Sequence, residues 1–463
     1  MSIRHAAQQV NPFLSAPIGR LFLSNVLPMA VVMSMGGVLN VVDGIFVGHF
    51  IGSDALAAIS LAFPVIMVLI ALTTLAGGGM SSLMARHLGA GDRVAAGRFL
   101  AGAHGLVLAI SLALVLLWVM GGATLVNSMA AGNPKVAEMA QHYLLIMILG
   151  APVQFMLGVH ADALRNEGRA GLIAALSVLV NLLNIGANWL GIVVLGFGIS
   201  GSALGTVAAQ ILGLALVVGV RARSKGLVPL SVLRTQSWLG AWSQIVRLGL
   251  PLCLGFIGIA VVASVTMLAL QLHAGAQYGA LIAAYGVVTR ILAFSFLPQM
   301  AIALATQSIA GNNAGAGRND RALAALRMAM GAAFLWCLSV VSVAFLAGAT
   351  LGRWFSDDPG VIAAVAEILR PMMLIYATSG PILVLAMYFQ AIGQPGRTAA
   401  LTLVKPWLLT PVLILALSAA FGVSGLWLAF PMADAIILTL AVTIGRNVLL
   451  DANTSAADAE TRT

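Results

Sequence analysis

The sequence predicts an all-α polytopic membrane protein, with 12 transmembrane helices in two six-helix lobes related by pseudo-two-fold symmetry. Three observations carry this prediction. They are an apolar composition, twelve apolar stretches of helical length, and a set of motifs that recur in the second half of the chain. The stretches set the number of helices, and the repeat sets their division into two lobes.

Composition sets the broad class of the protein. Of 463 residues, 61% are hydrophobic and 8% are charged, whereas soluble globular proteins have about 45–50% apolar and about 25% charged residues. A soluble domain cannot bury this apolar excess, which excludes a soluble enzyme or a soluble nucleic-acid-binding protein. The net charge of +9 is therefore interpreted as an orientation signal. Cys253 and Cys337 lie far apart in apolar stretches and form neither a disulfide framework nor a metal site.

Twelve predominantly apolar stretches are long enough to cross a bilayer, which takes about 20 residues. Their apolarity is continuous rather than alternating, and this favours helices over the strands of a membrane barrel. The stretches cover about 21–47, 56–83, 99–120, 139–163, 172–195, 202–220, 246–271, 280–309, 327–349, 366–392, 400–421 and 425–446.

Lysine and arginine predict the orientation of the chain. With both termini on one side, eighteen of the 23 Lys and Arg residues fall on that side and three on the other. Arg290 and Lys405 remain within apolar stretches. This bias places the N- and C-termini in the cytoplasm. The expected location is the plasma membrane, which is the inner membrane in a bacterium.

The chain contains an internal repeat. Four features of the first half recur in the same order about 225 residues later. Because each half has an even number of spans, both halves have the same topology and are related by an axis along the membrane normal. Transporters commonly bind substrate near the midplane, between such repeats. The matches are Pro28 with Pro251, LGAGDRVAAGR (88–98) with AGAGRNDRALA (314–324), EGRAG (167–171) with QPGRTAA (394–400), and GISGSA (198–203) with GVSGLW (422–427).

The predicted domains follow from this repeat. The longest polar connection in the middle of the chain runs from Arg221 to Arg247 and separates the two halves. We therefore expect an N-lobe at 1–220, a cytoplasmic inter-lobe loop at 221–245, a C-lobe at 246–446, and a polar C-terminal tail at 447–463.

Segments in both halves resemble one transporter family. VVDGIFVGHFIGSDALAAISLAFP (41–64) is similar to the family's first hairpin, and AAYGVVTRI (283–291) to its span 8. MARHLGAGD (84–92) resembles the loop after span 2, with IAGNNAGAGRNDRA (309–322) as its counterpart. The family is that of multidrug and toxic compound extrusion (MATE) transporters, and the resemblance covers essentially the whole chain. It implies two six-helix lobes around a V-shaped central cavity, and export of organic, often cationic, compounds in exchange for inward H⁺ or Na⁺.

Asp43, within the first span, is the candidate proton-coupling residue. A carboxylate in a membrane helix costs about 2.5–3.5 kcal/mol on insertion scales, so an intramembrane acid indicates function. Burial penalises its charged form and so favours proton uptake. The resemblance adds that Asp43 stands where the family carries its span 1 coupling carboxylate. The alternative is an acid that reaches the membrane interface, because the turn at Gly48–Gly52 is close.

Three asparagines of span 5 share one helix face. Asn181, Asn184 and Asn188 are spaced by three and four residues. Family members often have Asn followed four residues later by Asp, so Asn188 stands where a second N-lobe acid could be. An amide can hydrogen-bond a carboxylate or coordinate a cation, but it cannot carry a proton. We expect a coupling or substrate network with Asp43. The alternative is ordinary interhelical hydrogen bonding, worth about 0.6 kcal/mol per contact.

The C-lobe departs from the sodium-coupled branch of the family. Members of that branch carry a Glu in span 7 and an Asp in span 10. Here the corresponding stretches, PLCLGFIGIAVVASV (251–265) and ATSGPILVLAMYF (377–389), contain no acid. Na⁺ favours oxygen ligands, often carboxylates. H⁺ is therefore the expected coupling ion and Na⁺ the alternative.

Three other charges lie within C-lobe spans. Asp434 is in the middle of its span, and Arg290 and Lys405 are the intramembrane cations that can oppose it. Pairing that neutralises charge is the favoured interpretation. A second site for substrate or protons is the alternative.

Two histidines and an aspartate lie near the predicted cytoplasmic ends of spans. These are His104, His160 and Asp162. We expect their side chains to reach the membrane interface, where a polar tip stays hydrated while its stem is buried. No role in transport is predicted for them.

The expected function is secondary active antiport that exports drug-like organic compounds, often cationic, in exchange for inward H⁺. Its partners are small organic molecules, H⁺ and the lipid bilayer, with no nucleic acid and no cofactor, and the protein is expected to be a monomer. The alternatives are a Na⁺-coupled exporter and a lipid-linked saccharide flippase of the same superfamily. A flippase needs more cationic residues than Arg290 and Lys405 to meet phosphates. A membrane enzyme is disfavoured, because the spans carry no H-E-x-x-H motif, paired acids or Cys/His cluster.

Overall fold

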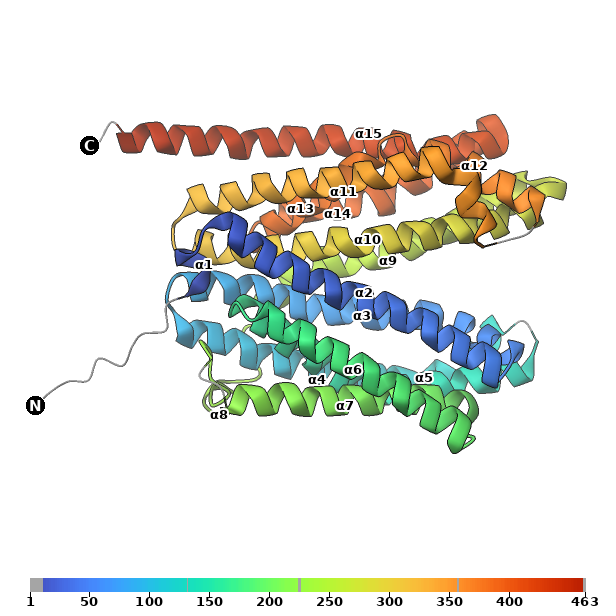
Figure 1. Cartoon of the computed structure of the whole chain (residues 1–463), viewed down its shortest axis with the longest axis horizontal. Coiled ribbons are helices and arrows are strands. Elements are labelled where there is room, and N and C mark those ends of the chain that lie inside the picture. The colour runs from blue at the N-terminus through green and yellow to red at the C-terminus, as the bar shows by residue number, and fades with distance from the viewer. Residues whose placement is uncertain (1–10, 131, 224–225, 356–357, 461–463) are drawn as a thin grey trace, which may run out of the picture. The chain divides into compact units, whose positions relative to one another are not determined.

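The computed structural model describes residues 11–130, 132–223, 226–355 and 358–460. Within these ranges every regular element is a helix (Figure 1), which confirms the predicted all-α class. The chain divides into two compact units. Unit 1 comprises Met1–Cys253 with Gly311–Gly317, and unit 2 comprises Leu254–Ala310 with Arg318–Thr463.

Unit 1 is built from long helices joined by short turns with capping residues. Asp92 accepts a hydrogen bond from the backbone N–H of Ala95 at the start of α4. Asn133 does the same for Val136 at the start of α5. Such caps satisfy backbone donors that a helix leaves unpaired at its N-terminus. The helices are α1 (Pro12–Ser15), α2 (Ile18–Phe50), α3 (Ser53–Gly89), α4 (Arg93–Met129), α5 (Pro134–Asn166), α6 (Ala170–Trp189), the π-helix η1 (Leu190–Val194), α7 (Gly198–Arg223) and α8 (Val232–Thr235).

Unit 2 contains more interruptions within its helices. The break between α12 and α13 bends the chain by 56°, and Gly422 breaks α15 with φ 63°. Glycine suits that position because a side chain is strained at positive φ. The helices are α9 (Trp242–His273), which begins in unit 1, the 3₁₀ turn η2 (Gly275–Gln277), α10 (Tyr278–Gly315), α11 (Asn319–Arg353), α12 (Pro359–Met373), the 3₁₀ turn η3 (Tyr376–Thr378), α13 (Ser379–Ala391), α14 (Pro395–Val404), the π-helix η4 (Lys405–Leu409) and α15 (Thr410–Glu460).

The twelve predicted spans all fall on helical segments. Among the described residues, 10 helices are long and apolar enough to cross a membrane, or 11 when the bent pair α12 and α13 is counted as one span. The stretch Pro395–Arg446 holds both of the last two predicted spans, and Gly422 separates them. The count falls below twelve because a break splits one span into α12 and α13, and because two spans are merged in Pro395–Arg446.

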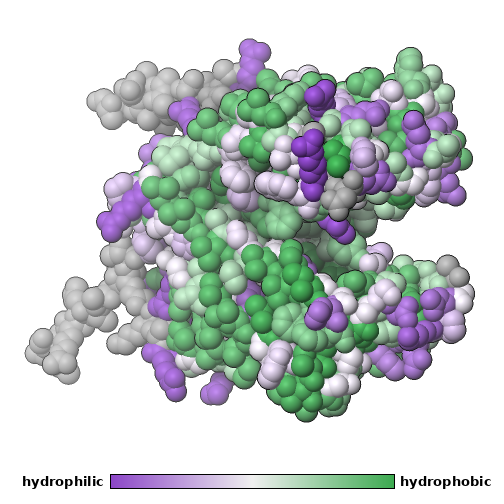
Figure 2. Space-filling model, turned by 45° about the vertical axis from the view of Figure 1, so that its right-hand side comes forward, coloured by the Kyte–Doolittle hydropathy of each residue, from purple (hydrophilic) through white to green (hydrophobic). Residues whose placement is uncertain are grey.

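The outer surface is apolar, as a lipid-facing surface must be. Figure 2 shows hydrophobic residues over much of the visible face. Large side chains such as Met120 and Leu346 are 82% and 88% exposed. Apolar exposure on this scale marks a membrane or partner surface rather than the surface of a soluble monomer.

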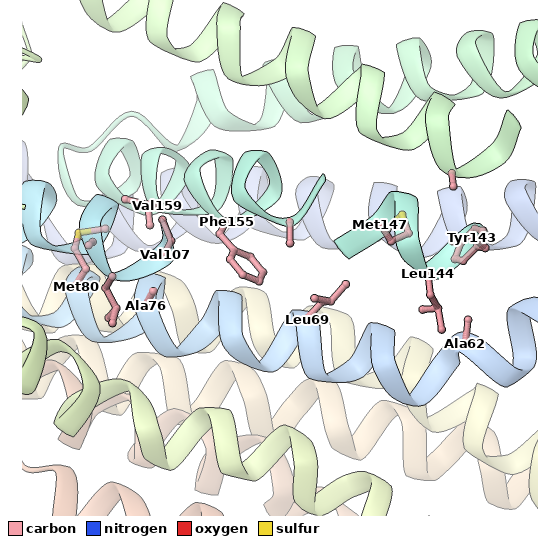
Figure 3. Packing of buried hydrophobic residues seen from close by; sticks show 14 of the residues in the cluster. Ala62, Leu69, Ala76, Met80, Val107, Tyr143, Leu144, Met147, Phe155 and Val159 are labelled. Carbon is pink, nitrogen blue, oxygen red and sulfur yellow. The ribbon is translucent and has the colours of Figure 1, made fainter. Parts of the chain in front are cut away.

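Small residues let the helices of unit 1 pack closely. A Cβ atom at Gly79 of α3 would overlap the backbone of Ile245, and one at Gly249 would overlap the backbone of Leu75. In membranes such close backbone approach supports helix association, since lipid provides no hydrophobic drive between helices. Figure 3 shows the adjoining core, where Leu69 of α3 lies beside Phe155 of α5.

The end of α10 packs in unit 1. Asn11 Nδ2 donates to Asn312 Oδ1 at 2.7 Å, and a Cβ atom at Gly89 of α3 would overlap the backbone of Asn312. These contacts explain why Gly311–Gly317 belongs to unit 1 although the rest of α10 belongs to unit 2.

Candidate functional site

Asp43 lies on α2, two turns before the helix ends at Phe50. Its side chain is half-buried, and Asn188 Nδ2 of α6 donates a hydrogen bond to Asp43 Oδ1 at 2.7 Å. Within the described ranges no lysine, arginine or histidine forms an ion pair with Asp43. The carboxylate is thus held by a neutral amide, and no cation of the described segments compensates its charge.

The hydrogen bonds continue from Asp43 through α6 to α7. Asn188 Nδ2 also donates to Asn184 Oδ1 at 3.1 Å, and Asn184 Nδ2 donates to Thr206 Oγ1 at 3.0 Å. Thr206 Oγ1 in turn donates to the backbone carbonyl of Ser202 at 3.1 Å. Both asparagines are buried, Asn184 at 2% and Asn188 at 1% exposure. One chain of donors and acceptors therefore links three helices.

Gly205 makes room for this chain of hydrogen bonds. A Cβ atom at position 205 would overlap Asn188 Oδ1. In the described part of the protein, that buried oxygen has no hydrogen-bond partner. The π-helix Leu190–Val194 begins two residues after Asn188, and π-helical turns are frequent at functional sites. The site therefore combines tight packing with one acceptor, Asn188 Oδ1, that no described donor reaches.

Sequence reasoning placed Asn181, Asn184 and Asn188 in one network with Asp43. The structure brings Asn188 and Asn184 into it, together with a threonine that the sequence did not indicate. Asn181 Nδ2 contacts Ser177 Oγ at 3.5 Å within its own helix and takes no part in the chain of hydrogen bonds. Thr206 was missed because its role depends on which face of α7 packs against α6. The neighbouring Gly205, a small residue on that contact face, was the available signal.

Of the three charges within C-lobe spans, two form an ion pair and the third, Arg290, has no ion-pair partner among the described residues. Lys405 Nζ forms an ion pair with Asp434 Oδ1, and Asp434 is 4% exposed. Arg290 is exposed, and within the described ranges it forms no ion pair. Of the two cations that were expected to neutralise Asp434, Lys405 is the one that forms an ion pair with it.

A neutral polar cluster lies at the break between α12 and α13. Tyr376 OH is 2.8 Å from Ser295 Oγ and accepts a hydrogen bond from Gln299 Nε2 at 2.8 Å. Ser379 Oγ donates to Gln299 Oε1 at 3.2 Å. A search for charged residues overlooks this cluster, because all four side chains are uncharged and their partners lie far apart in sequence.

The histidines expected at the membrane interface are buried, so that prediction is wrong for both. His104 and His160 are 3% and 2% exposed, and their Nε2 atoms are 3.2 Å apart. His104 Nδ1 is 2.8 Å from the carbonyl oxygen of Leu100. Asp162 forms an ion pair with Arg165 at 2.7 Å. These polar groups find partners inside unit 1 instead of reaching water. No group of three or more potential metal ligands occurs among the described residues.

Curated relatives match almost the whole chain. A FAD transporter of Shewanella oneidensis is 26% identical over 436 residues, which is 91% of this chain and 93% of the relative. The multidrug export protein MepA of Staphylococcus aureus is 25% identical over 449 residues, with 94% of this chain and 95% of the relative covered.

Solved structures share the fold. A transporter of the MOP superfamily from Pyrococcus furiosus matches with a TM-score of 0.87 at 24% identity, covering 95% of this chain and 97% of that one. An outward-facing MATE family transporter matches with a TM-score of 0.86 at 23% identity, over 96% and 98% of the two chains. The MatE family model matches residues 28–190 and 251–415. The repeat, the two matched halves and the shared fold lead to one conclusion: the chain belongs to the MATE family of membrane transporters.

Proposed function

We propose that this transporter exports organic small molecules, cations among them, in exchange for inward H⁺, with Asp43 as the proton carrier. The observation that carries the proposal is a membrane carboxylate held by one neutral amide and by no described cation. An acid in that setting can exist with or without its proton, since no fixed positive charge holds it ionised. Relatives named for FAD transport and for multidrug export support an organic substrate.

Protonation of Asp43 changes the hydrogen bonds that its carboxyl group can form with Asn188. The ionised carboxylate accepts from Asn188 Nδ2, whereas a protonated carboxyl group can also donate. The acceptor for that donation is Asn188 Oδ1, which has no partner among the described residues. Rotation of the amide brings Oδ1 to Asp43 and removes Nδ2 from Asn184. The same rearrangement then reaches Thr206 through Asn184.

Export follows from this change in the hydrogen bonds and charge of Asp43. Asp43 takes up a proton from outside when the site opens outward, and the loss of negative charge releases a cationic substrate. The proton leaves to the cytoplasm after the return to the inward-open state. Exchange of one proton for a monovalent cation moves no net charge, so the pH gradient drives it. With an uncharged substrate one positive charge enters per cycle, and the membrane potential then adds about 2.3 kcal/mol per 100 mV.

Two features support H⁺ over Na⁺ as the coupling ion. The site around Asp43 contains one carboxylate, and its other members are amides and a hydroxyl. In unit 2 the intramembrane acid Asp434 is already compensated by Lys405. A buried Na⁺ needs compensating oxygen ligands and charge, and a proton needs only the carboxylate itself.

Na⁺ coupling is the second candidate, and one observation favours it. Asn188 Oδ1 is a buried oxygen without a partner in the described part of the chain, close to a carboxylate. Together with Thr206 Oγ1 it offers neutral oxygen ligands to a small cation. A flippase for lipid-linked saccharides is the weaker alternative, since Arg290 is the one intramembrane cation left without a described ion pair.

The test is transport by purified protein in liposomes, with ethidium as the organic cation. We expect uphill ethidium movement with an imposed pH gradient in Na⁺-free buffer. Asp43→Asn removes it, because the amide cannot carry a proton. The matched control is Asp54→Asn, since Asp54 is 44% exposed and pairs with exposed Lys135. Wild-type rates in Asp43→Asn would overturn the assignment of the carrier. Transport that requires Na⁺ and ignores the pH gradient would select the second candidate.

A further inference from the structure

A cavity of about 350 Å³ lies in unit 2, apart from the site around Asp43. One wall is a stripe on α10 that runs from Ile282 to Arg290, and the opposite wall includes Phe355 and Val361. The α10 stripe repeats at helical spacing, so these side chains share one face. The volume of the cavity is within the range of small-molecule sites, about 300–1,000 Å³.

Arg290 is the charged member of an otherwise apolar lining. No carboxylate in the described ranges pairs with it, whereas Lys405, the other intramembrane cation, is paired with Asp434. A guanidinium group offers paired N–H donors in a planar fork that match carboxylate, sulfonate and phosphate groups. An unpaired arginine in a membrane segment is costly, and such residues usually face a cavity or pathway.

We infer that this cavity binds the anionic group of an amphiphilic organic substrate. Arg290 pairs with the negative charge, and the apolar walls contact the hydrophobic part of the molecule. The inference rests on the proposed export function and adds a substrate class to it. Molecules with a carboxylate, sulfonate or phosphate, zwitterions included, are then substrates alongside simple cations.

The location of the cavity leaves two sources for the anionic group. Phe355 and Val361 lie where α11 ends and α12 begins, so the cavity reaches the level of the helix ends. A free amphiphile and the phosphate of a lipid head group present the same chemistry to Arg290, and the experiment distinguishes them.

Gly286 allows the shape of the cavity to be tested apart from its charge. A Cβ atom at Gly286 meets no other atom within 4 Å, and the residue belongs to the lining. Gly286→Leu therefore fills open space without forcing the backbone to move. Arg290→Gln removes the charge, and Arg290→Lys keeps it without the planar fork.

The experiment is calorimetric binding to purified protein in phosphatidylcholine nanodiscs. The probes are a naphthalenesulfonate, the uncharged naphthalenesulfonamide and the cationic naphthylmethylammonium. Arg290→Gln should weaken sulfonate binding at least about tenfold, as expected for loss of a charge-assisted hydrogen bond. It should leave sulfonamide and ammonium binding unchanged. Arg290→Lys should retain most of the sulfonate affinity, and Gly286→Leu should weaken sulfonate and sulfonamide together. The matched control is Arg353→Gln, at the end of α11 and outside the lining.

Three binding results would overturn the role of Arg290 in this cavity. Equal weakening of all three probes by Arg290→Gln, or no weakening, would overturn it. So would sulfonate binding that phosphatidylglycerol in the nanodisc displaces from wild type, since that result assigns the cavity to a lipid head group. No ion gradient enters the measurement. Failure here is therefore separate from failure of H⁺ coupling, which the Asp43→Asn liposome experiment detects.

Discussion

At the scale of the residue, the N-lobe site depends on one amide group, that of Asn188, which hydrogen-bonds two neighbours. Asn188 Nδ2 serves both Asp43 and Asn184, and Asn188 Oδ1 lies against Gly205 without a described partner. The amide cannot take up a proton itself. In the proposed mechanism it responds to the proton on Asp43 by rotation, and a Cβ atom at Gly205 would overlap its oxygen.

The first prediction concerns Gly205. In Gly205→Ala the added methyl group overlaps Asn188 Oδ1, and relief of that overlap moves Asn188 away from Asp43. We expect strongly reduced H⁺-coupled ethidium transport and a loss of about 1–3 kcal/mol of stability, the usual cost of overpacking. Gly219→Ala is the control on the same helix, because its Cβ atom meets nothing within 4 Å. Transport and thermal melting in detergent measure both effects, and equal behaviour of the two variants would contradict the packing argument.

At the scale of the element, glycines set which helices approach closely. The crossing of α3 and α9 in unit 1 brings Gly249 against the backbone of Leu75 and Gly79 against that of Ile245. Membrane helices rely on such close packing because the bilayer supplies no hydrophobic drive between them. The crossing is therefore intolerant of added atoms on either helix.

The second prediction compares two glycines of α9. Gly249→Ala should lower stability by about 1–3 kcal/mol, since its Cβ atom has no free space. Gly255→Ala should be neutral or stabilising, because its nearest neighbour is at 3.7 Å and alanine favours helix by about 1 kcal/mol over glycine. The midpoint of thermal unfolding in detergent measures the difference. A larger loss from Gly255→Ala would show that the close crossing is not what limits stability.

The elements also show what the sequence alone could predict. Spans were found because membrane helices need about 20 apolar residues, and the two-fold repeat was visible in short motifs. The link between Asp43 and Asn188 was expected from helix spacing and family resemblance. Contacts that depend on tertiary packing were not accessible: Thr206 needs the register of α7, and the Tyr376 cluster needs a bent span. The burial of the histidine pair also depends on neighbours distant in sequence.

At the scale of the whole molecule, the distribution of positive charge predicts the orientation in the membrane. Both termini and the segment around Ser231 are expected on the cytoplasmic side. Ser231 is exposed at the start of α8, and Ser53 is exposed at the turn between α2 and α3. These two serines are separated by an odd number of predicted spans and should lie on opposite sides of the membrane.

The third prediction tests this orientation. Cys253 and Cys337, both buried, are replaced by alanine, and Ser231→Cys and Ser53→Cys are made separately in that background. A membrane-impermeant maleimide should label Ser231→Cys only in inverted vesicles and Ser53→Cys only in spheroplasts. Labelling of both variants from one side, or of Ser231→Cys from outside, would contradict the twelve-span topology.

The central claim is that one proton on Asp43 and an organic cation exclude each other, and proton release on substrate binding tests it most directly. Ethidium is added to purified protein in weakly buffered detergent solution, and the released protons are measured with a pH indicator. Wild type should release protons in proportion to the ethidium bound, and Asp43→Asn should bind ethidium, if more weakly, without release. Asp54→Asn should behave as wild type. Equal proton release from wild type and Asp43→Asn would contradict the account and move the carrier to another residue.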